Sequence, residues 1–324
     1  MIDQTGLYQL QDLEPTAAEF ATAVSAGLSA TPRTLPCKFF YDAAGSVLFD
    51  RICDLPEYYL TRTECRILAR RAGEIAALLA PYGSLVEFGA GSASKVGLVL
   101  SKIQRPLVYV PVDISRSHLL AGAAILARSF PRLRIAPICA DYTQPFELPE
   151  IAAGMAGGAA GFFPGSTIGN FAPDEATAFL ARARQILGAG ALMIVGADLQ
   201  KDQATLHAAY NDAAGVTAAF NLNLLRRINR ELGGNFDLSG FEHAARWNPG
   251  AGRVEMHLVS LRRQSVRIGE ERFDFAAGET IHTENSHKYT VEGFGAMARA
   301  AGFEPVECWT DEAGLFSVHA IRAR

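Results

Sequence analysis

A glycine-containing turn between an apolar strand and a helix constrains this chain more than any other feature. Ser84–Phe88 is a short, mainly apolar run, Gly89 and Gly91 follow it, and residues 92–103 then have helical spacing. Glycines at such a junction let the backbone turn sharply and let a ligand approach it closely. Residues 87–91 (EFGAG) therefore predict a ligand-binding turn at the carboxyl end of a parallel strand.

The segments around this turn alternate between strand-like and helix-like patterns. We expect further strands at residues 106–112, 133–139, 161–164 and 191–196, and helices at 115–130 and 173–187. We interpret the Gly- and Ala-rich residues 152–161 as a surface loop, with an Ala-rich helix end as the alternative. Strands separated by helices of this length favour an α/β fold with a mostly parallel sheet covered on both faces.

The pattern changes after about residue 200. Residues 203–232 are predicted to be mostly helical, 253–262 to form a strand, and 265–275 to pair with that strand. A helix at 289–301 and a strand pair at 306–309 and 315–321 then complete the alternating core. We expect a core domain of residues 62–200 and 287–324, and a second α+β domain of residues 1–61 and 201–286.

Net charge, apolar run lengths and cysteine spacing argue against several other classes of protein. The net charge is −4, which argues against a nucleic-acid-binding protein. The amino-terminal residues lack the pattern of a signal peptide, and no apolar run is long enough for a membrane span. The five cysteines form no CxxC pair and show no zinc-type spacing with histidines. We expect a cytoplasmic protein with reduced thiols and no metal, acting as a monomer on a small molecule.

Three acidic residues distinguish between the cofactors that such a turn can bind. A dinucleotide-binding turn needs a third glycine where this chain has Ser94. Glu87 suits a cofactor with a cationic aminocarboxypropyl end, Asp113 can accept hydrogen bonds from ribose hydroxyls, and Asp141 can accept one from an adenine amino group. The pattern favours S-adenosylmethionine, held by Glu87, Gly89, Gly91, Lys95, Asp113 and Asp141, and leaves a nicotinamide cofactor as the less favoured alternative.

Long motifs outside this core resemble one known family. They are FFYDAAGS (residues 39–46) with LFD (48–50), LPEYY (55–59) with TRTE (61–64), GSTIGNF (165–171), YNDAAGVTAAFN (210–221), FEH (241–243) with ARWN (245–248), and TENS (283–286). Together they are similar to the histidine Nα-methyltransferases of ergothioneine biosynthesis. The resemblance extends from about residue 30 to the end of the chain. It implies a class I methyltransferase fold and S-adenosylmethionine-dependent trimethylation of the α-amino group of L-histidine to hercynine.

The resemblance also implies roles for individual residues. Asn170 and Tyr210 match positions that hold the carboxylate and amino end of the substrate, and Glu284 and Ser286 match the pair that binds the imidazole. Tyr58 and Met256 match residues of the substrate pocket, and Tyr41 matches a tyrosine near the amine, where it is the candidate proton acceptor. A site that bonds both ring nitrogens disfavours apolar side chains, which would leave its polar groups unpaired.

Several of these residues have simpler interpretations when taken singly. Asn170 could cap the helix that begins near Pro173, and Ser286 could cap the helix near Tyr289. His282 and His287 are expected to face solvent. Leu60 stands where the family usually has proline, in a segment we expect to be a loop near the amine.

Two other functions stay open on the sequence. One is N-methylation of a different amino acid, such as a tryptophan derivative. The other is cofactor binding without catalysis. Glu284 favours histidine over an indole, because an indole has only one N–H to offer.

Overall fold

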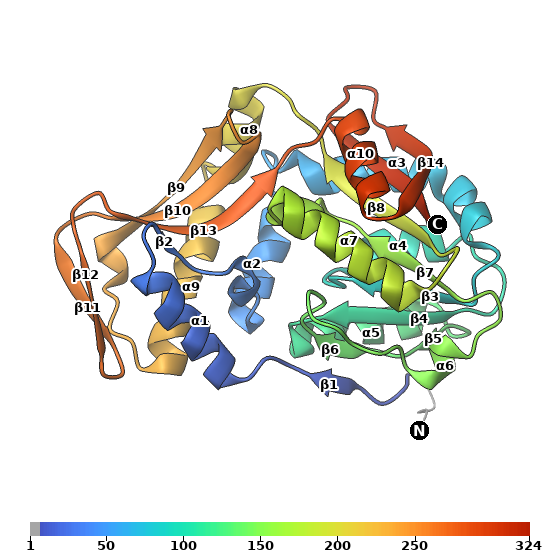
Figure 1. Cartoon of the computed structure of the whole chain (residues 1–324), viewed down its shortest axis with the longest axis horizontal. Helices are drawn as coiled ribbons and strands as arrows, with labels where there is room; N and C mark the ends of the chain where they lie inside the picture. The colour runs from blue at the N-terminus through green and yellow to red at the C-terminus, as the bar shows by residue number, and fades with distance from the viewer. Residues whose placement is uncertain (1–6) are drawn as a thin grey trace. The chain divides into compact units, whose positions relative to one another are not determined.

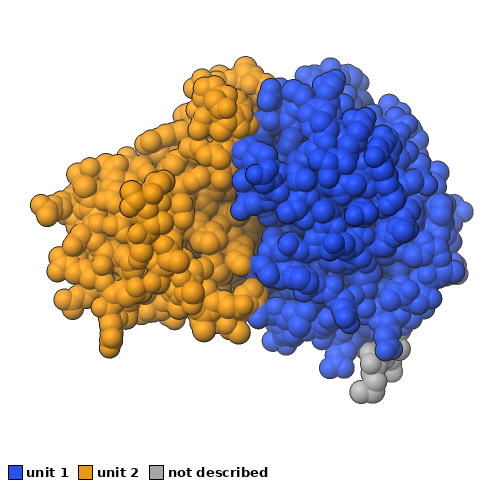
Figure 2. Space-filling view, in the orientation of Figure 1, with its two compact units in different colours: residues 1–14, 60–200, 287–324 blue, residues 15–59, 201–286 orange. Residues whose placement is uncertain are grey.

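The computed structural model describes residues 7–324, and their contacts divide the chain into two compact units (Figure 2). The first unit contains residues 7–14, Leu60–Gln200 and His287–Arg324, and the second contains Pro15–Tyr59 and Lys201–Ser286. Residues 7–14 were expected in the second domain and lie in the first. The reason is that β1 (Gln11–Leu13) pairs in parallel with β6 (Ile138–Ala140) of the first unit's sheet.

The first unit is built on a mostly parallel sheet, as expected. Its strand order within residues 7–324 is β1-β6-β4-β3-β7-β8-β15-β14, and β5 also pairs with β4. Among the strands that the structure describes, the antiparallel pairs of this sheet are β8 with β15 and β15 with β14. The remaining bounds are β3 (Ser84–Phe88), β4 (Val108–Asp113), β5 (Arg134–Ile135), β7 (Ala159–Phe163), β8 (Leu192–Asp198), β14 (Phe303–Thr310) and β15 (Phe316–Ala323). The sheet thus places the carboxyl ends of β3, β4, β6 and β7 along one edge.

Helices cover both faces of this sheet (Figure 1). One face carries α3 (Tyr59–Leu79), α4 (Ala93–Leu100) and α5 (Arg116–Ser129), and the other carries α6 (Glu150–Ala153), α7 (Pro173–Leu187) and α10 (Val291–Ala300). Pro173 occupies the first turn of α7, where its missing N–H costs no hydrogen bond. The Thr290 side chain caps α10 by accepting from the amide of Gly293. Neither helix therefore uses Asn170 or Ser286 as its cap.

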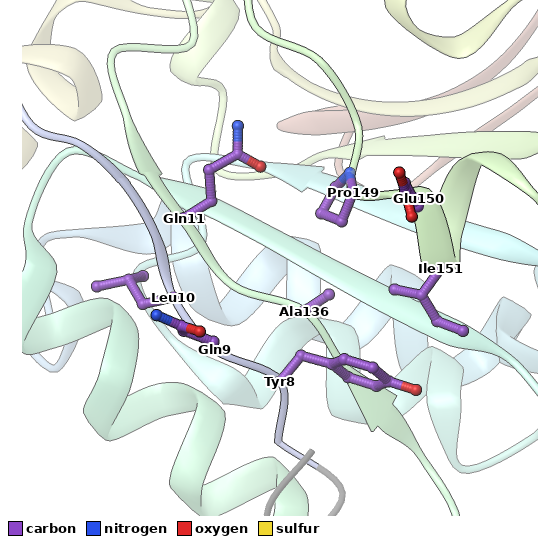
Figure 3. A pocket seen from close by; sticks show the side chains of 8 residues that line it. All are labelled: Tyr8, Gln9, Leu10, Gln11, Ala136, Pro149, Glu150 and Ile151. Atoms are coloured by element: carbon purple, nitrogen blue, oxygen red, sulfur yellow. The ribbon is translucent and has the colours of Figure 1, made fainter. Parts of the chain in front are cut away.

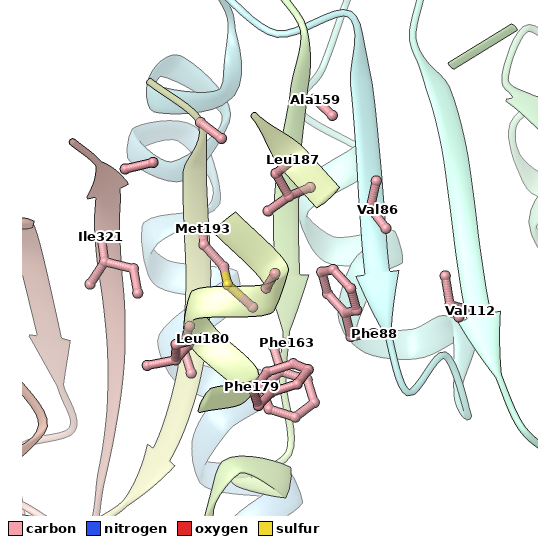
Figure 4. Packing of buried hydrophobic residues seen from close by; sticks show 14 of the residues in the cluster. Val86, Phe88, Val112, Ala159, Phe163, Phe179, Leu180, Leu187, Met193 and Ile321 are labelled. Carbon is pink, nitrogen blue, oxygen red and sulfur yellow. The ribbon is translucent and has the colours of Figure 1, made fainter. Parts of the chain in front are cut away.

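Alternation along the strands decides which residues face each layer of helices. Val86 and Phe88 of β3 pack with Phe179 of α7 in a buried hydrophobic cluster (Figure 4). Because side chains alternate along a strand, Glu87 between them faces the opposite side of the sheet. All five residues of β3 are buried, which is the pattern of a strand covered on both faces.

The second unit contains a four-stranded sheet and a separate hairpin. The sheet order is β2-β13-β10-β9, with β2 (Arg33–Thr34), β13 (Thr280–His287), β10 (Arg253–Ser260) and β9 (Phe241–Asn248). Burial alternates along β10, and α9 (Val216–Leu232) packs on β9 and β10. The other helices are α1 (Ala17–Ser29), α2 (Ala43–Cys53) and α8 (Gln203–Tyr210), with short 3-10 turns η1 (Cys37–Phe40), η2 (Thr167–Asn170, in the first unit) and η3 (Leu238–Gly240).

Three details differ from the sequence expectation. Residues 152–161 include the end of α6 and the start of β7, so they are not only a loop. The helical stretch 203–232 is broken into α8 and α9, because Gly215 adopts a positive φ of 69° and Asp212 accepts the first amides of α9. Residues 265–275 form the hairpin β11 (Gln264–Ile268) and β12 (Glu271–Phe275), which pairs with itself and not with β10.

A search of residues 7–324 finds no helix with the length and apolar character to cross a membrane.

Candidate active site

The turn after β3 has the geometry expected of a ligand-binding turn. Gly89 has φ +75°, a left-handed conformation that favours glycine, and its amide donates to the carbonyl of Val112 at 2.8 Å. The amide of Gly91 donates to the Gly89 carbonyl at 2.9 Å. A Cβ atom at Gly91 would contact the ring of His118 at 3.6 Å. The turn thus leads from β3 into α4, whose first residue is Ala93.

Glu87 lies at the end of β3 with its carboxylate almost completely buried. The Tyr109 hydroxyl of neighbouring β4 donates a 2.5 Å hydrogen bond to Glu87 Oε2. Burial raises the pKa of Glu87 to about 8, although the Tyr109 hydrogen bond and the charge of Lys95 oppose that shift. A buried carboxyl group of this kind is suited to receive a cationic ligand group, which would compensate its charge.

The two other predicted cofactor acids follow the next strands of the sheet. Asp113 ends β4, accepts a hydrogen bond from the Ser115 amide at 2.7 Å, and has its pKa raised to about 6 by burial. Asp141 follows β6, and its Oδ1 accepts from the amide and the hydroxyl of Thr143 at 2.9 and 2.5 Å. The parallel sheet thereby places Glu87, Asp113 and Asp141 at the carboxyl ends of successive strands.

Lys95 is held by an acidic residue that sequence reasoning did not identify. Lys95 Nζ lies 2.7 Å from Oε2 of Glu64, which belongs to α3 and is 1% exposed. The Glu64 carboxylate also accepts the amide of Gly165, which follows β7, at 2.9 Å. Glu64 thus ties α3 and α4 to the end of β7. Its only signal in the sequence was its place in the TRTE motif.

The tight packing around Glu64 predicts a large effect of adding one methyl group to β8. A Cβ atom at Gly196 would lie 2.1 Å from Glu64 Oε1, so Gly196→Ala must shift the carboxylate group whose Oε2 pairs with Lys95. Removing one partner of a buried ion pair costs about 3–5 kcal/mol, and we expect the shift of Glu64 to lower the free energy of unfolding by up to that amount in denaturant titrations. Gly73→Ala, in open space on α3, is the matched control and should not destabilise the protein. Equal stability of the two variants would contradict this role of Glu64.

The GSTIGN segment, which contains Asn170, belongs to the first unit and follows β7. Ser166 has φ +59°, and its hydroxyl accepts the amide of Asp198 at 2.9 Å. Asp198 in turn forms a 2.8 Å ion pair with Lys288, and both of these side chains are fully buried. Asn170 is the last residue of η2. The segment is therefore anchored to β8 through a buried polar network.

Four of the predicted substrate residues come together in the second unit. The ring of Tyr58 packs edge-on against that of Tyr210, with centroids 6.3 Å apart, and the Tyr210 hydroxyl lies 2.7 Å from the Ser286 hydroxyl. Burial raises the pKa of Tyr58 well above its usual value, and the neighbouring Tyr210, Cys53 and Glu284 add to that shift. The buried hydroxyl pair of Tyr210 and Ser286 thus lies beside the packed rings of Tyr58 and Tyr210.

Tyr41 and Met256 complete the set that was expected in this unit. The Tyr41 ring packs edge-on against Phe49 and Phe220, with centroids 5.6 and 5.7 Å apart. Met256 is buried on β10, and its backbone carbonyl lies 3.1 Å from the hydroxyl of Thr283 on β13. Tyr41 thus shares an aromatic cluster with Tyr58, because both rings contact Phe49.

Three residues differ from their expected surroundings. His287 was expected to face solvent, yet it is 7% exposed, because it ends β13 and packs against Gly169 of η2. His282 is partly buried: its ring stacks on His257 at 4.9 Å, and Nε2 lies 3.0 Å from the Glu284 carbonyl. Leu60 is not in a loop but in the first turn of α3, where proline would also be tolerated.

A hollow of about 400 Å³ lies elsewhere on the first unit, beside β1 (Figure 3). It is lined by Tyr8, Gln9, Leu10, Gln11, Ala136, Pro149, Glu150 and Ile151. Ala136 precedes β6, whereas Asp141 follows it, so the hollow is at the amino side of that strand. No residue predicted to bind cofactor or substrate lines it.

Comparison with known proteins identifies the family. The family model for histidine-specific, S-adenosylmethionine-dependent methyltransferases matches residues 20–323. The chain is 41% identical to the histidine N-alpha-methyltransferase of Mycolicibacterium smegmatis over 91% of its own length and 92% of that protein. It is 42% identical to the histidine N-alpha-methyltransferase of Mycobacterium tuberculosis over the same shares of the two chains.

A fungal relative extends the comparison. The chain is 30% identical to ergothioneine biosynthesis protein 1 of Neurospora crassa over 88% of its own length, which corresponds to 33% of that longer protein. The chain therefore belongs to the family of histidine-specific methyltransferases that depend on S-adenosylmethionine.

Proposed function

We propose that this protein transfers methyl groups from S-adenosylmethionine to the α-amino nitrogen of L-histidine and forms the trimethylated betaine hercynine, as a step of ergothioneine biosynthesis. The observation that carries the proposal is the buried set of Tyr58, Tyr210 and Ser286. The charge of Glu284 contributes to the raised pKa of Tyr58 in this set. Hydroxyl and carboxylate groups of this kind suit a polar amino acid with two ring nitrogens.

The first unit is proposed to hold the cofactor. Glu87 would receive its ammonium group, Asp113 its ribose hydroxyls and Asp141 its adenine amino group, while Gly89 and Gly91 leave room for it beside the turn. The donor set fits, because these three carboxyl groups favour a cofactor that carries a sulfonium and an ammonium charge. When bound, the cofactor supplies an electrophilic methyl group on sulfur. Lys95, held by Glu64, is proposed to lie beside the carboxylate end of the cofactor.

The second unit is proposed to hold the imidazole and the amine. Glu284 would accept the ring N–H, and Ser286, already paired with Tyr210, would bond the other ring nitrogen. Met256 and Tyr58 would line the side-chain pocket, and Tyr210 would hold the amino end without a fixed charge. Asn170, which belongs to the first unit, is proposed as a further uncharged ligand of the substrate carboxylate. Direct displacement at the methyl carbon needs mainly alignment of the amine, so positioning is the principal task of these residues.

A neutral amine is required for attack, because an ammonium group has no lone pair. A free α-amine is still largely protonated near pH 7. Tyr41 is the proposed proton acceptor, and its aromatic neighbours Phe49 and Phe220 would keep its ring in place. We also propose that the protein acts as a monomer in the cytoplasm, and light scattering that gives the mass of one chain would support this state.

Methyl transfer to a panel of free amines tests the proposal. We expect turnover with histidine and little with histamine, which lacks the carboxylate. We also expect little with tryptophan, which has one ring nitrogen, or with phenylalanine, which has none. Faster turnover with tryptophan than with histidine would support the alternative substrate class. Cofactor binding without turnover of any amine would support a non-catalytic role.

A further inference from the structure

His243 of the FEH motif has no role in the function described so far. It lies on β9, opposite Leu258 of β10, and its ring is placed between the end of α8 and the face of α9. Nε2 is 2.8 Å from the backbone carbonyl of Tyr210, and Nδ1 is 2.9 Å from the side-chain amide nitrogen of Asn221. All of these residues belong to the second unit.

The partners of the two ring nitrogens specify one form of the imidazole. A backbone carbonyl can only accept, so Nε2 must carry the hydrogen that it donates to Tyr210. An amide nitrogen can only donate, so Nδ1 must be unprotonated and accept from Asn221. The ring is therefore neutral and protonated on Nε2.

The orientation of the Asn221 amide is fixed independently. Its nitrogen also donates to the carbonyl of His257 at 3.0 Å, and its oxygen accepts the Thr283 hydroxyl at 2.8 Å. A flipped amide would set its oxygen against the His257 carbonyl, two acceptors facing each other. The form assigned to His243 thus does not depend on a free choice of amide orientation.

This hydrogen-bond network ends at the proposed substrate residues. On one side, Tyr210 carries the hydroxyl that pairs with Ser286. On the other, Thr283 is the residue immediately before Glu284 on β13. Asn211, next to Tyr210, exchanges two 3.1 Å hydrogen bonds with the backbone of Ala245 and holds α8 on β9 as well.

We propose that His243, as the neutral Nε2-protonated tautomer, is a positioning residue that sets Tyr210 and the Glu284 segment for binding of the amino-acid substrate. The inference rests on the proposed function, since it assigns these residues to histidine. It adds a residue that touches neither the substrate nor the cofactor and acts through Tyr210 and Asn221.

The environment of the ring opposes a second proton. Burial lowers the pKa of His243, while the Tyr210 carbonyl and the charge of Asp212, in the turn before α9, act in the other direction. A proton on Nδ1 would face the amide hydrogens of Asn221 and break that contact. The positioning form of the ring is thus the neutral one.

Nitrogen-15 NMR of the full-length protein labelled at histidine tests the tautomer directly. We expect His243, assigned by its absence in His243→Gln, to show a protonated Nε2 and an unprotonated Nδ1 at pH 7. A protonated Nδ1, in either the other tautomer or the imidazolium, would overturn the proposal. This readout needs no turnover, so it can hold even if the enzyme proves to act on another amino acid.

Three substitutions test the positioning role. His243→Gln can still donate to the Tyr210 carbonyl, His243→Asn can still accept from Asn221, and His243→Leu can do neither. We expect KM for histidine to rise about tenfold in the leucine variant and to recover to within about threefold of wild type in the glutamine variant. The turnover number and the affinity for S-adenosylmethionine should change much less.

His207→Gln, an exposed histidine on α8, is the matched control and should keep the wild-type KM. If the role of His243 were purely structural, the substitutions would lower the melting temperature, but KM would not be higher in the leucine variant than in the glutamine variant. Unchanged KM in all three variants would overturn the proposal. If the leucine variant does not fold, the KM values for histidine of the glutamine and asparagine variants, each compared with wild type, decide the question.

Discussion

Glu87→Gln is expected to weaken S-adenosylmethionine binding by about 10- to 100-fold while making the protein more stable at pH 8. The loss of affinity follows because a neutral amide cannot balance the ammonium group that the Glu87 carboxylate is proposed to receive.

The gain in stability follows from burial, which raises the pKa of Glu87 to about 8 from a usual value of 4.5. The folded protein then binds a proton that the unfolded chain has released, so its stability falls as pH rises from about 4.5 through 8. Glutamine removes that loss. Isothermal titration calorimetry and thermal unfolding measure the two effects.

The same carboxyl group predicts a pH dependence for the wild-type protein. Below pH 8, a proton must leave Glu87 before the carboxylate can pair with the ammonium, so affinity should rise by up to about tenfold for each pH unit. Above pH 8, the α-amino group of the cofactor loses its own proton and affinity should fall. Binding should therefore be tightest near pH 8, and Glu87→Gln should abolish the acidic limb.

Glu312→Gln is the control for both experiments, because Glu312 is exposed and its ion pair with Arg70 lies at the surface. It should leave affinity and stability close to wild type. Unchanged cofactor affinity in Glu87→Gln, or a loss of stability at pH 8, would contradict the role given to this carboxyl group.

Glu284→Leu is expected to lower kcat/KM for histidine by about 100- to 1000-fold. The leucine cannot accept the imidazole N–H, so the ring would be buried with a donor unpaired. Steady-state kinetics with histidine measures the loss. The affinity for S-adenosylmethionine should stay within about twofold of wild type, since Glu284 belongs to the second unit and the proposed cofactor residues belong to the first.

Glu242→Gln is the matched control, an exposed glutamate in the same sheet, on β9. Its kinetics should match wild type. If Glu284→Leu retained full activity with histidine, the assignment of the imidazole to Glu284 would be wrong.

The cofactor half of the fold was predictable because its signals are local. Each buried parallel strand is a mainly apolar run, and each acid at the end of a strand reaches the same edge of the sheet. Gly89 and Gly91 were informative for the same reason, because a sharp turn requires such residues wherever the rest of the chain lies. The parallel sheet with helices on both faces was confirmed.

The acceptor half could not be derived in this way. Tyr58, Tyr210 and Ser286 lie far apart in sequence and meet at the end of α8, where the Tyr210 hydroxyl reaches Ser286 of β13, so only family resemblance pointed to them. Glu64 and His243 were missed because their importance depends on partners more than 30 residues away, Lys95 and Gly165 for Glu64 and Tyr210 for His243. The strand pairing of residues 265–275 was wrong because alternation along a strand does not specify its partner.

Mass spectrometry of histidine incubated with the protein and S-adenosylmethionine tests the central claim most directly. We expect histidine to gain three methyl groups, and fragmentation to place all three on the α-nitrogen. Unmodified histidine in a reaction that methylates another amino acid would contradict the account, as would methyl groups on the imidazole ring.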